Sequence, residues 1–138
     1  MAGPQSADRV RERGADEVVD HTAGDVVAAV TEPVDVLLNL APVDPDQLKA
    51  LVGTVRDGGV VVSTTVWMPT PGDDARGVRA VDLFVDSDAG QLAELVSQVD
   101  RGELVVDVAE RVPLADLASV HARALEGALP GKVVVTVA

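Results

Sequence analysis

Hydrophobic and polar positions follow two periods along this chain, and together they predict alternating strands and helices. Apolar runs bounded by Gly, Pro or Asp are typical of strands, and apolar residues three or four positions apart are typical of amphipathic helices. The runs predict strands over residues 17–20, 34–40, 60–66, 78–85, 105–112 and 132–137. The wider spacing predicts helices over residues 7–13, 23–30, 45–57, 91–101 and 114–126. In the fourth of these helices it predicts that four apolar residues face inward, namely Leu92, Leu95, Val96 and Val99. This alternation predicts an α/β fold with a mostly parallel sheet, flanking helices and right-handed crossovers.

Local residues predict where several of these elements begin. Ser6 can cap the first helix, and Thr22 has capping-box spacing before the second. Asp44 is followed by proline at the first helical position and by a capping-box glutamine. The strands at 34–40 and 60–66 are apolar on both alternations, so we expect both of their faces to be covered.

The composition narrows the class of protein. The 138 residues have the size of one domain, and a hydrophobic content of 47% excludes intrinsic disorder. The 29 valines favour strands, because β-branched side chains fit a pleated sheet. The absence of cysteine excludes disulfides, thiolate metal sites and a cysteine nucleophile, and two histidines are too few for a multi-histidine zinc site.

The charge balance excludes two kinds of partner. A formal net charge of −12 disfavours nucleic acid and anionic membrane surfaces, so we expect neither as a partner. No apolar run approaches the ~20 residues that a membrane span needs. The first residues also lack the charged and apolar regions of a signal peptide. We therefore expect a cytoplasmic protein.

Candidate chemistry lies where the predicted strands end, because open α/β sheets bind ligands beyond the carboxyl ends of their strands. No G-x-G-x-x-G, P-loop or G-x-S-x-G motif occurs in the chain. His21 ends a predicted strand at that edge, so it either binds a ligand or simply ends the strand in solvent. His121 falls on an apolar helical stripe, which favours a packed histidine over a catalytic one. Asp73 and Asp74 are interpreted as solvated loop carboxylates rather than a metal site.

Several segments occur in the order typical of one family. They are Arg-Gly-Ala-Asp-Glu-Val-Val-Asp-His-Thr (13–22), Val-Asp-Val-Leu-Leu-Asn (34–39), Arg-Asp-Gly-Gly-Val-Val-Val-Ser (56–63), the Pro-Leu-Ala-Asp…His-Ala run (113–122) and Gly-Lys-Val-Val-Val (131–135). Together they resemble the C-terminal, cofactor-domain half of the medium-chain dehydrogenase/reductase superfamily, which includes zinc-type alcohol dehydrogenases and quinone oxidoreductases. The resemblance implies one α/β domain over 1–138. Residues 6–102 would form a partial Rossmann region that lacks the first two strands, and residues 103–138 a βαβ unit that in the family joins the catalytic domain.

The resemblance also implies a cofactor, NADP, and positions around it. Those cofactor-binding positions are Ser6, Arg9, His21, Asn39, Leu40, Ala41, Thr64, Thr65, Val66, Phe84 and Val85. Ser6 and Arg9 would hold the 2′-phosphate, together with His21, which stands where the family commonly has tyrosine. The residues at 39–41 would line the ribose, whereas those at 64–66 and the backbone at 84–85 would approach the nicotinamide.

Three features of the family do not occur in this sequence, and their absence leads to three hypotheses. The glycine-rich turn, the catalytic domain and the zinc ligands do not occur in these residues, so we expect no catalytic residue and no zinc. The favoured hypothesis is a cofactor-binding region of an NADPH-dependent reductase that is inactive alone. The alternatives are a dimerising or partner-binding module, and one chain of a split reductase completed by a chain that supplies the other half. We also expect a homodimer through the apolar edge strand 78–85, which carries Val78, Ala80, Leu83 and Val85.

Overall fold

The computed structural model describes residues 1–4, 6–65 and 67–137. Contacts divide the chain into two compact units, Met1–Ser87 and Asp88–Ala138, and each unit is described by itself. The α/β class with parallel sheets is confirmed. The expected single domain, with its regions 6–102 and 103–138, stays a prediction.

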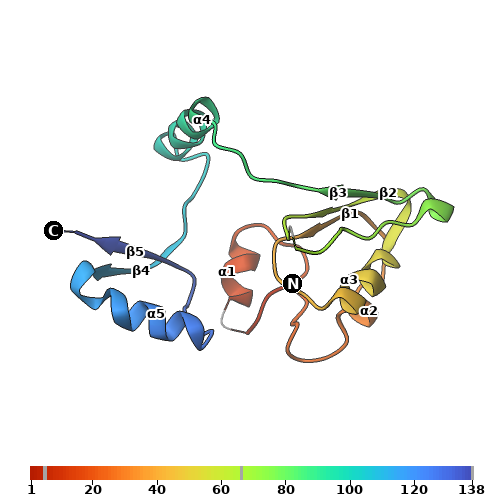
Figure 1. Ribbon diagram of the computed structural model, residues 1–138, viewed down its shortest axis with the longest axis horizontal. Helices are drawn as coiled ribbons and strands as arrows, with labels where there is room; N and C mark the ends of the chain where they lie inside the picture. The colour runs from red at the N-terminus through yellow and green to blue at the C-terminus, as the bar shows by residue number, and fades with distance from the viewer. Residues whose placement is uncertain (5, 66, 138) are drawn as a thin grey trace. The chain divides into compact units, whose positions relative to one another are not determined.

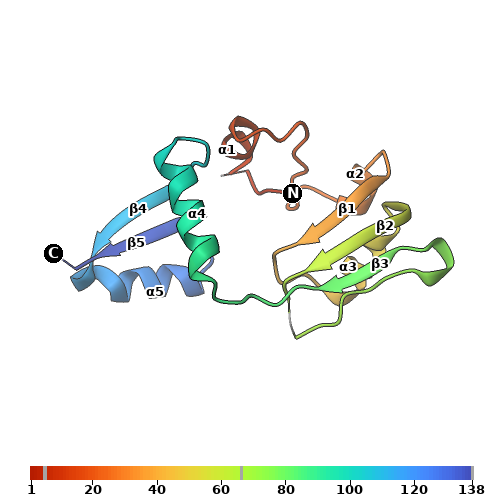
Figure 2. The ribbon, with the colours of Figure 1, turned by 90° about the horizontal axis from the view of Figure 1, so that it is seen from above.

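The first unit is a three-stranded parallel sheet with short helices. Its elements are α1 (Ala7–Glu12), α2 (Val26–Ala29), β1 (Val34–Asn39), α3 (Pro45–Val52), β2 (Val55–Ser63), the 3-10 turn η1 (Asp74–Arg76) and β3 (Arg79–Asp82). The strand order is β1-β2-β3, with β1 and β3 both parallel to the central β2. Figures 1 and 2 show α2 and α3 on one face of this sheet. The carboxyl ends of the three strands therefore lie at one edge.

The core of this unit lies between α3 and the sheet. The helix buries Leu48, Leu51 and Val52, and its N-terminus is capped by Asp44 as the sequence predicts. Val52 packs in one cluster with two buried valines of β2, Val55 and Val61, and with Val78 just before β3. Val34 and Leu37 of β1 pack against that cluster. Full burial of each such side chain contributes about 1.5–3 kcal/mol, so this one helix-on-sheet layer stabilises the unit.

The opposite face of the sheet is open within this unit. Val36 and Leu38 of β1 are each 54% exposed, and Val81 of β3 is exposed as well. In the register, Leu38 lies beside Val62 and Val62 lies beside Val81, so these side chains share one face. The prediction that both faces are covered is wrong for this unit, because α2 and α3 supply a layer on one face only.

The boundary between α3 and β2 differs from the sequence prediction. The helix ends at Val52 instead of continuing to Gly58, and Val55 is a buried strand residue. The spacing of Val52 and Val55 imitates a helical stripe, which explains the wrong prediction. Between Val55 and Val60 the pairing of β2 with β1 shifts register, and Gly58 in this stretch takes a φ of 73°. A strand that bends in this way needs a residue without Cβ.

Two expectations for residues 17–25 are also wrong. Residues 17–20 form no strand, and only an isolated parallel bridge joins Asp20 to Ala2. The cap of α2 is Asp25, whose side chain accepts two amide hydrogens of the helix. Thr22 instead donates from its amide and its hydroxyl to Asp20, at 2.8 and 2.7 Å. These hydrogen bonds lower the pKa of Asp20, because they stabilise the charged carboxylate.

The second unit contains a long helix and a βαβ unit. Its elements are α4 (Ala89–Asp100), β4 (Val108–Pro113), the 3-10 turn η2 (Leu114–Asp116), α5 (Leu117–Leu125) and β5 (Lys132–Thr136). β4 and β5 pair in parallel, and η2 and α5 connect them. The strand expected over 105–112 begins at Val108, three residues late, and Val105 and Val106 before it are exposed.

Two predictions of inward-facing residues in this unit are wrong. The apolar stripe of α4, which is Leu92, Leu95, Val96 and Val99, is exposed along its length. His121 is exposed too, because α5 buries the neighbouring Val120. Among the described residues, no helix is long and apolar enough to cross a membrane.

Candidate functional site

A cavity of about 740 Å³ opens in the first unit at the carboxyl end of β1. One wall consists of residues near the N-terminus together with His21, and the other consists of the end of β1 and the turn that leads into α3. Five residues expected at the cofactor line it, namely Ser6, His21, Asn39, Leu40 and Ala41. Segments far apart in sequence therefore meet at the edge of the sheet where open α/β folds bind ligands.

The N-terminal wall is held together by backbone contacts. Ala2 donates its amide hydrogen to the carbonyl of Val19 at 3.0 Å, next to the bridge with Asp20. The Ser6 hydroxyl donates to the carbonyl oxygen of Gly3 at 3.2 Å. A Cβ built on Gly3 would lie 3.5 Å from Nε2 of His21, so the imidazole lies close to this backbone. His21 is itself exposed and can be reached from solvent.

The opposite wall carries a carboxylate. Asp44 lines the cavity, and its Oδ1 accepts hydrogens from the amides of Asp46 and Gln47 at 2.9 and 3.2 Å. These amides at the start of α3 already have an acceptor, so a bound anion would have to compete with Asp44 for them. The cavity therefore has an imidazole on one wall and a carboxylate on the other.

A buried polar network lies behind this wall, at the ends of β1 and β2. Nδ2 of Asn39 donates to Oγ of Ser63 at 3.1 Å and lies 3.5 Å from Oγ1 of Thr65. The two hydroxyl oxygens are 2.6 Å apart, and the amide of Thr65 donates to Oγ of Ser63 at 3.2 Å. The amide of Thr64 donates to the carbonyl of Asn39 at 3.1 Å, which ties the two strand ends together.

The remaining expected cofactor residues that the structure describes do not line this cavity. Thr65 is buried with its hydroxyl in the network, so a ligand contact there would involve its backbone. Arg9 lies in α1, whereas Phe84 and Val85 are exposed beyond β3. Val66 lies outside the described residues. The roles expected for these residues stay predictions.

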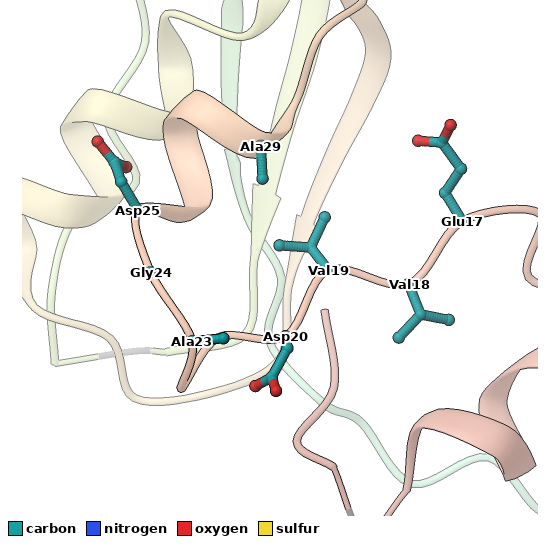
Figure 3. Close-up of a pocket in the computed structure, with 8 residues that line it drawn as sticks. All are labelled: Glu17, Val18, Val19, Asp20, Ala23, Gly24, Asp25 and Ala29. Atoms are coloured by element: carbon teal, nitrogen blue, oxygen red, sulfur yellow. The ribbon is translucent and has the colours of Figure 1, made fainter.

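A second hollow of about 460 Å³ has an acidic rim, which the sequence did not single out (Figure 3). It is lined by Glu17, Asp20, Asp25 and small or apolar residues. Two of the three carboxylates already serve local structure, since Asp20 accepts from Thr22 and Asp25 caps α2. The spacing of acidic residues could have predicted the rim but not the hollow.

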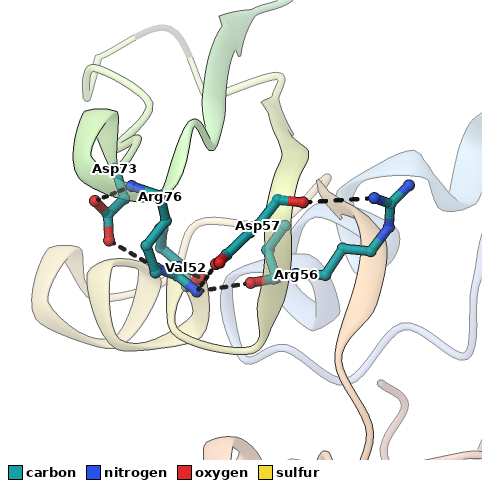
Figure 4. A network of polar contacts seen from close by, with 6 residues as sticks. Val52, Arg56, Asp57, Asp73 and Arg76 are labelled. Atoms are coloured by element: carbon teal, nitrogen blue, oxygen red, sulfur yellow. Dashed lines mark hydrogen bonds and ion pairs between the residues drawn. The ribbon is translucent and has the colours of Figure 1, made fainter.

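An arginine holds the loop before β3 against the start of β2 (Figure 4). Arg76 donates to the carbonyls of Val55 and Val52 at 2.9 and 2.8 Å and to the carboxylate of Asp73 at 2.8 Å. Its guanidinium lowers the pKa of Asp73, chiefly through that side-chain hydrogen bond. A carboxylate of Asp57 lies 3.8 Å away. This cluster is at the amino end of β2, so it supports the fold rather than the cavity.

Comparison with known proteins identifies the family. Residues 13–135 match the family model described as zinc-binding dehydrogenase. The chain belongs to the zinc-binding dehydrogenase family. The family predicted from the sequence is therefore confirmed. No curated protein matches this zinc-binding dehydrogenase chain.

Solved structures show the same fold. The quinone oxidoreductase of Coxiella burnetii matches with a TM-score of 0.83 and 22% identity, over 99% of this chain and 44% of that one. An NAD-dependent alcohol dehydrogenase matches with a TM-score of 0.80 and 21% identity, over 99% and 43%. A quinone oxidoreductase of Pseudomonas syringae pv. Tomato DC3000 matches at 0.73 and 21%, over 99% and 47%. The chain spans less than half the length of these structures.

The residues of this zinc-binding dehydrogenase chain do not fit zinc. The sequence contains no cysteine and two histidines. Within the part that the structure describes, no group of three or more His, Asp or Glu side chains could hold a metal ion. Structural and catalytic zinc sites need at least three such ligands, so we derive no step through zinc.

Proposed function

We propose that this chain supplies part of the nicotinamide-nucleotide site of an NADPH-dependent, quinone oxidoreductase-like reductase. The observation that supports this proposal is the cavity at the carboxyl end of β1, lined by Ser6, His21 and the residues 39–41. When bound, a nicotinamide nucleotide supplies hydride transfer, and the protein supplies binding and orientation.

Each wall of the cavity has a distinct task in this proposal. The backbone and side chains at 39–41 contact the ribose, and the imidazole of His21 donates a hydrogen bond to the 2′-phosphate. Ser6 at present donates its hydrogen to Gly3, so it must turn that hydrogen away to donate to a phosphate. Asp44 on the opposite wall disfavours the same phosphate, and its charge limits how strongly NADPH is preferred.

Other parts of the reductase site come from elsewhere in this proposal. The 138 residues contain no G-x-G-x-x-G turn, which in dinucleotide-binding folds holds the pyrophosphate. We propose that this turn and the substrate pocket come from a further polypeptide segment, and that the 138-residue chain alone does not turn over substrate.

Calorimetric titration of the chain with NADPH and NADH tests the binding proposal. We expect NADPH to bind more tightly than NADH, because Ser6 and His21 on the N-terminal wall can donate hydrogen bonds to the 2′-phosphate. His21→Ala should weaken the binding of NADPH and leave that of NADH nearly unchanged. Equal affinity for the two nucleotides, or no binding, would contradict the proposal.

A second candidate is a dimerising or partner-binding module. The open apolar face with Val36 and Leu38, and the exposed residues 83–85 after β3, favour it. A homodimer through residues 78–85 could not pair the start of this segment. Val78 already exchanges two backbone hydrogen bonds with Asp73 of the same chain, at 2.9 and 3.0 Å. Sedimentation at high concentration distinguishes the candidates: a stable dimer that Leu83→Glu dissociates, together with no nucleotide binding, would favour the module.

A further inference from the structure

Three of the buried polar side chains in the first unit meet at one point. Asn39, Ser63 and Thr65 are 8%, 2% and 3% exposed, and they lie at or just beyond the ends of β1 and β2. A buried hydroxyl or amide is tolerated when its hydrogen bonds are made, yet an apolar side chain of the same shape often serves a core equally well. We therefore infer that these three hydrogen-bonded side chains have a role besides packing in the core.

The hydrogen bonds fix which atom donates at each step. Oγ of Ser63 accepts from Nδ2 of Asn39 and from the amide of Thr65, which uses both of its lone pairs. Its own hydrogen must then go to Oγ1 of Thr65, 2.6 Å away. Ser63 thus has one arrangement in which all of its bonds are made.

The amide of Ala41 fixes how the carboxamide of Asn39 is turned. It donates to Oδ1 of Asn39 at 3.4 Å, so Nδ2 faces Ser63, whose hydroxyl oxygen accepts from it at 3.1 Å. Asn39 and Ala41 both line the cavity, whereas Ser63 does not. The hydroxyl of Ser63, which accepts from Nδ2, therefore helps to hold Asn39 in the orientation that leaves its oxygen, and not its NH₂ group, beside Ala41 in the wall.

We propose that Ser63 is a positioning residue for the nucleotide site. It holds the carboxamide of Asn39 so that the carboxamide oxygen faces the cavity. An acceptor at this place suits a ligand hydroxyl, such as a ribose hydroxyl, which can donate to it. This inference rests on the proposed function, since it names how that same cavity recognises its ligand.

The test compares variants by calorimetric titration with NADPH and by amide hydrogen exchange. Ser63→Ala should weaken NADPH binding about tenfold, which corresponds to ~1.4 kcal/mol, and should speed exchange at the amides of Ala41 and Thr65. Ser63→Thr keeps the hydroxyl and should restore most of the affinity. Val61→Ala is the matched control, because it truncates a fully buried residue of the same strand outside the network.

The outcomes separate this role from general stability and from the proposed function. If Ser63→Ala does not fold, Thr65→Val, which removes the acceptor of the Ser63 hydrogen at nearly constant shape, should weaken binding about threefold. Unchanged NADPH affinity in the network variants, or an equal loss in Val61→Ala, overturns the positioning role. A wild-type chain that binds no nucleotide overturns the proposed function, and the role of Ser63 toward its ligand falls with it.

Discussion

Replacing Arg76 by alanine should lower the stability of the first unit more than any other exposed-charge substitution in its loop. The guanidinium donates to the carbonyls of Val52, the last residue of α3, and Val55, the first residue of β2. Hydrogen bonds that involve a charged group contribute about 1.5–3 kcal/mol each. The side chain of Arg76 is 31% exposed, and water can reach the freed carbonyls, so we expect a loss of about 2–3 kcal/mol for both bonds together.

Urea denaturation followed by circular dichroism measures this loss. With a slope of about 1–3 kcal/mol/M, the midpoint should fall by about 1 M or more at an unchanged slope. Arg76→Lys keeps the charge but cannot bond both carbonyls and Asp73 in a fork, so it should lose an intermediate amount. Arg79→Ala, an exposed arginine in β3, is the control and should change the unfolding free energy by less than about 0.5 kcal/mol. Equal midpoints for Arg76→Ala and Arg79→Ala would refute the reasoning.

Three further predictions concern a glycine and two carboxylates. Gly59→Ala should destabilise the chain by about 1–3 kcal/mol in the same urea assay, because its Cβ would lie 2.8 Å from a backbone oxygen, whereas Gly24→Ala has open space and should be nearly neutral. Hydrogen bonds from Thr70 lower the pKa of Asp82 below its usual 3.8. The carboxylate therefore stabilises the fold above about pH 4, and this contribution is lost as the pH falls through the lowered pKa. Asp82→Asn should reduce the loss of stability that urea titrations show between about pH 5 and about pH 3. Asp44→Asn keeps a helix cap but removes a charge, so calorimetry should show tighter NADPH binding and little change for NADH. The same change for both nucleotides would contradict the placement of the 2′-phosphate in this cavity.

The sequence predicts the bounds of a helix best where a side chain next to the helix caps its first amides. The cap by Asp44 was correct because its side chain bonds the next amides of its own helix. The cap by Thr22 was wrong because Asp25 stands nearer to the apolar stretch and offers a carboxylate to the same helix. The helix predicted through Val55 was wrong because the shift in register between β1 and β2 depends on pairing, which periodicity does not contain.

The candidate site was predicted only in part, for a related reason. Five of the cofactor positions converge because parallel strands end at one edge, which topology alone predicts. Asp44 was recognised as a cap but not as part of the cavity wall, since its second role depends on the path of the N-terminal residues. Ser63 could not be separated from its neighbours in sequence, because its donors lie across the sheet on Asn39 and in the following turn.

The most direct test of the central claim is a heteronuclear NMR titration of the isotope-labelled chain with NADPH. The account predicts that saturating NADPH shifts the amide resonances of His21 and of residues 39–41, which line the cavity, while those of β4 and β5 stay in place. An unchanged spectrum, or shifts confined to residues 88–137, would contradict the claim that this cavity binds a nicotinamide nucleotide.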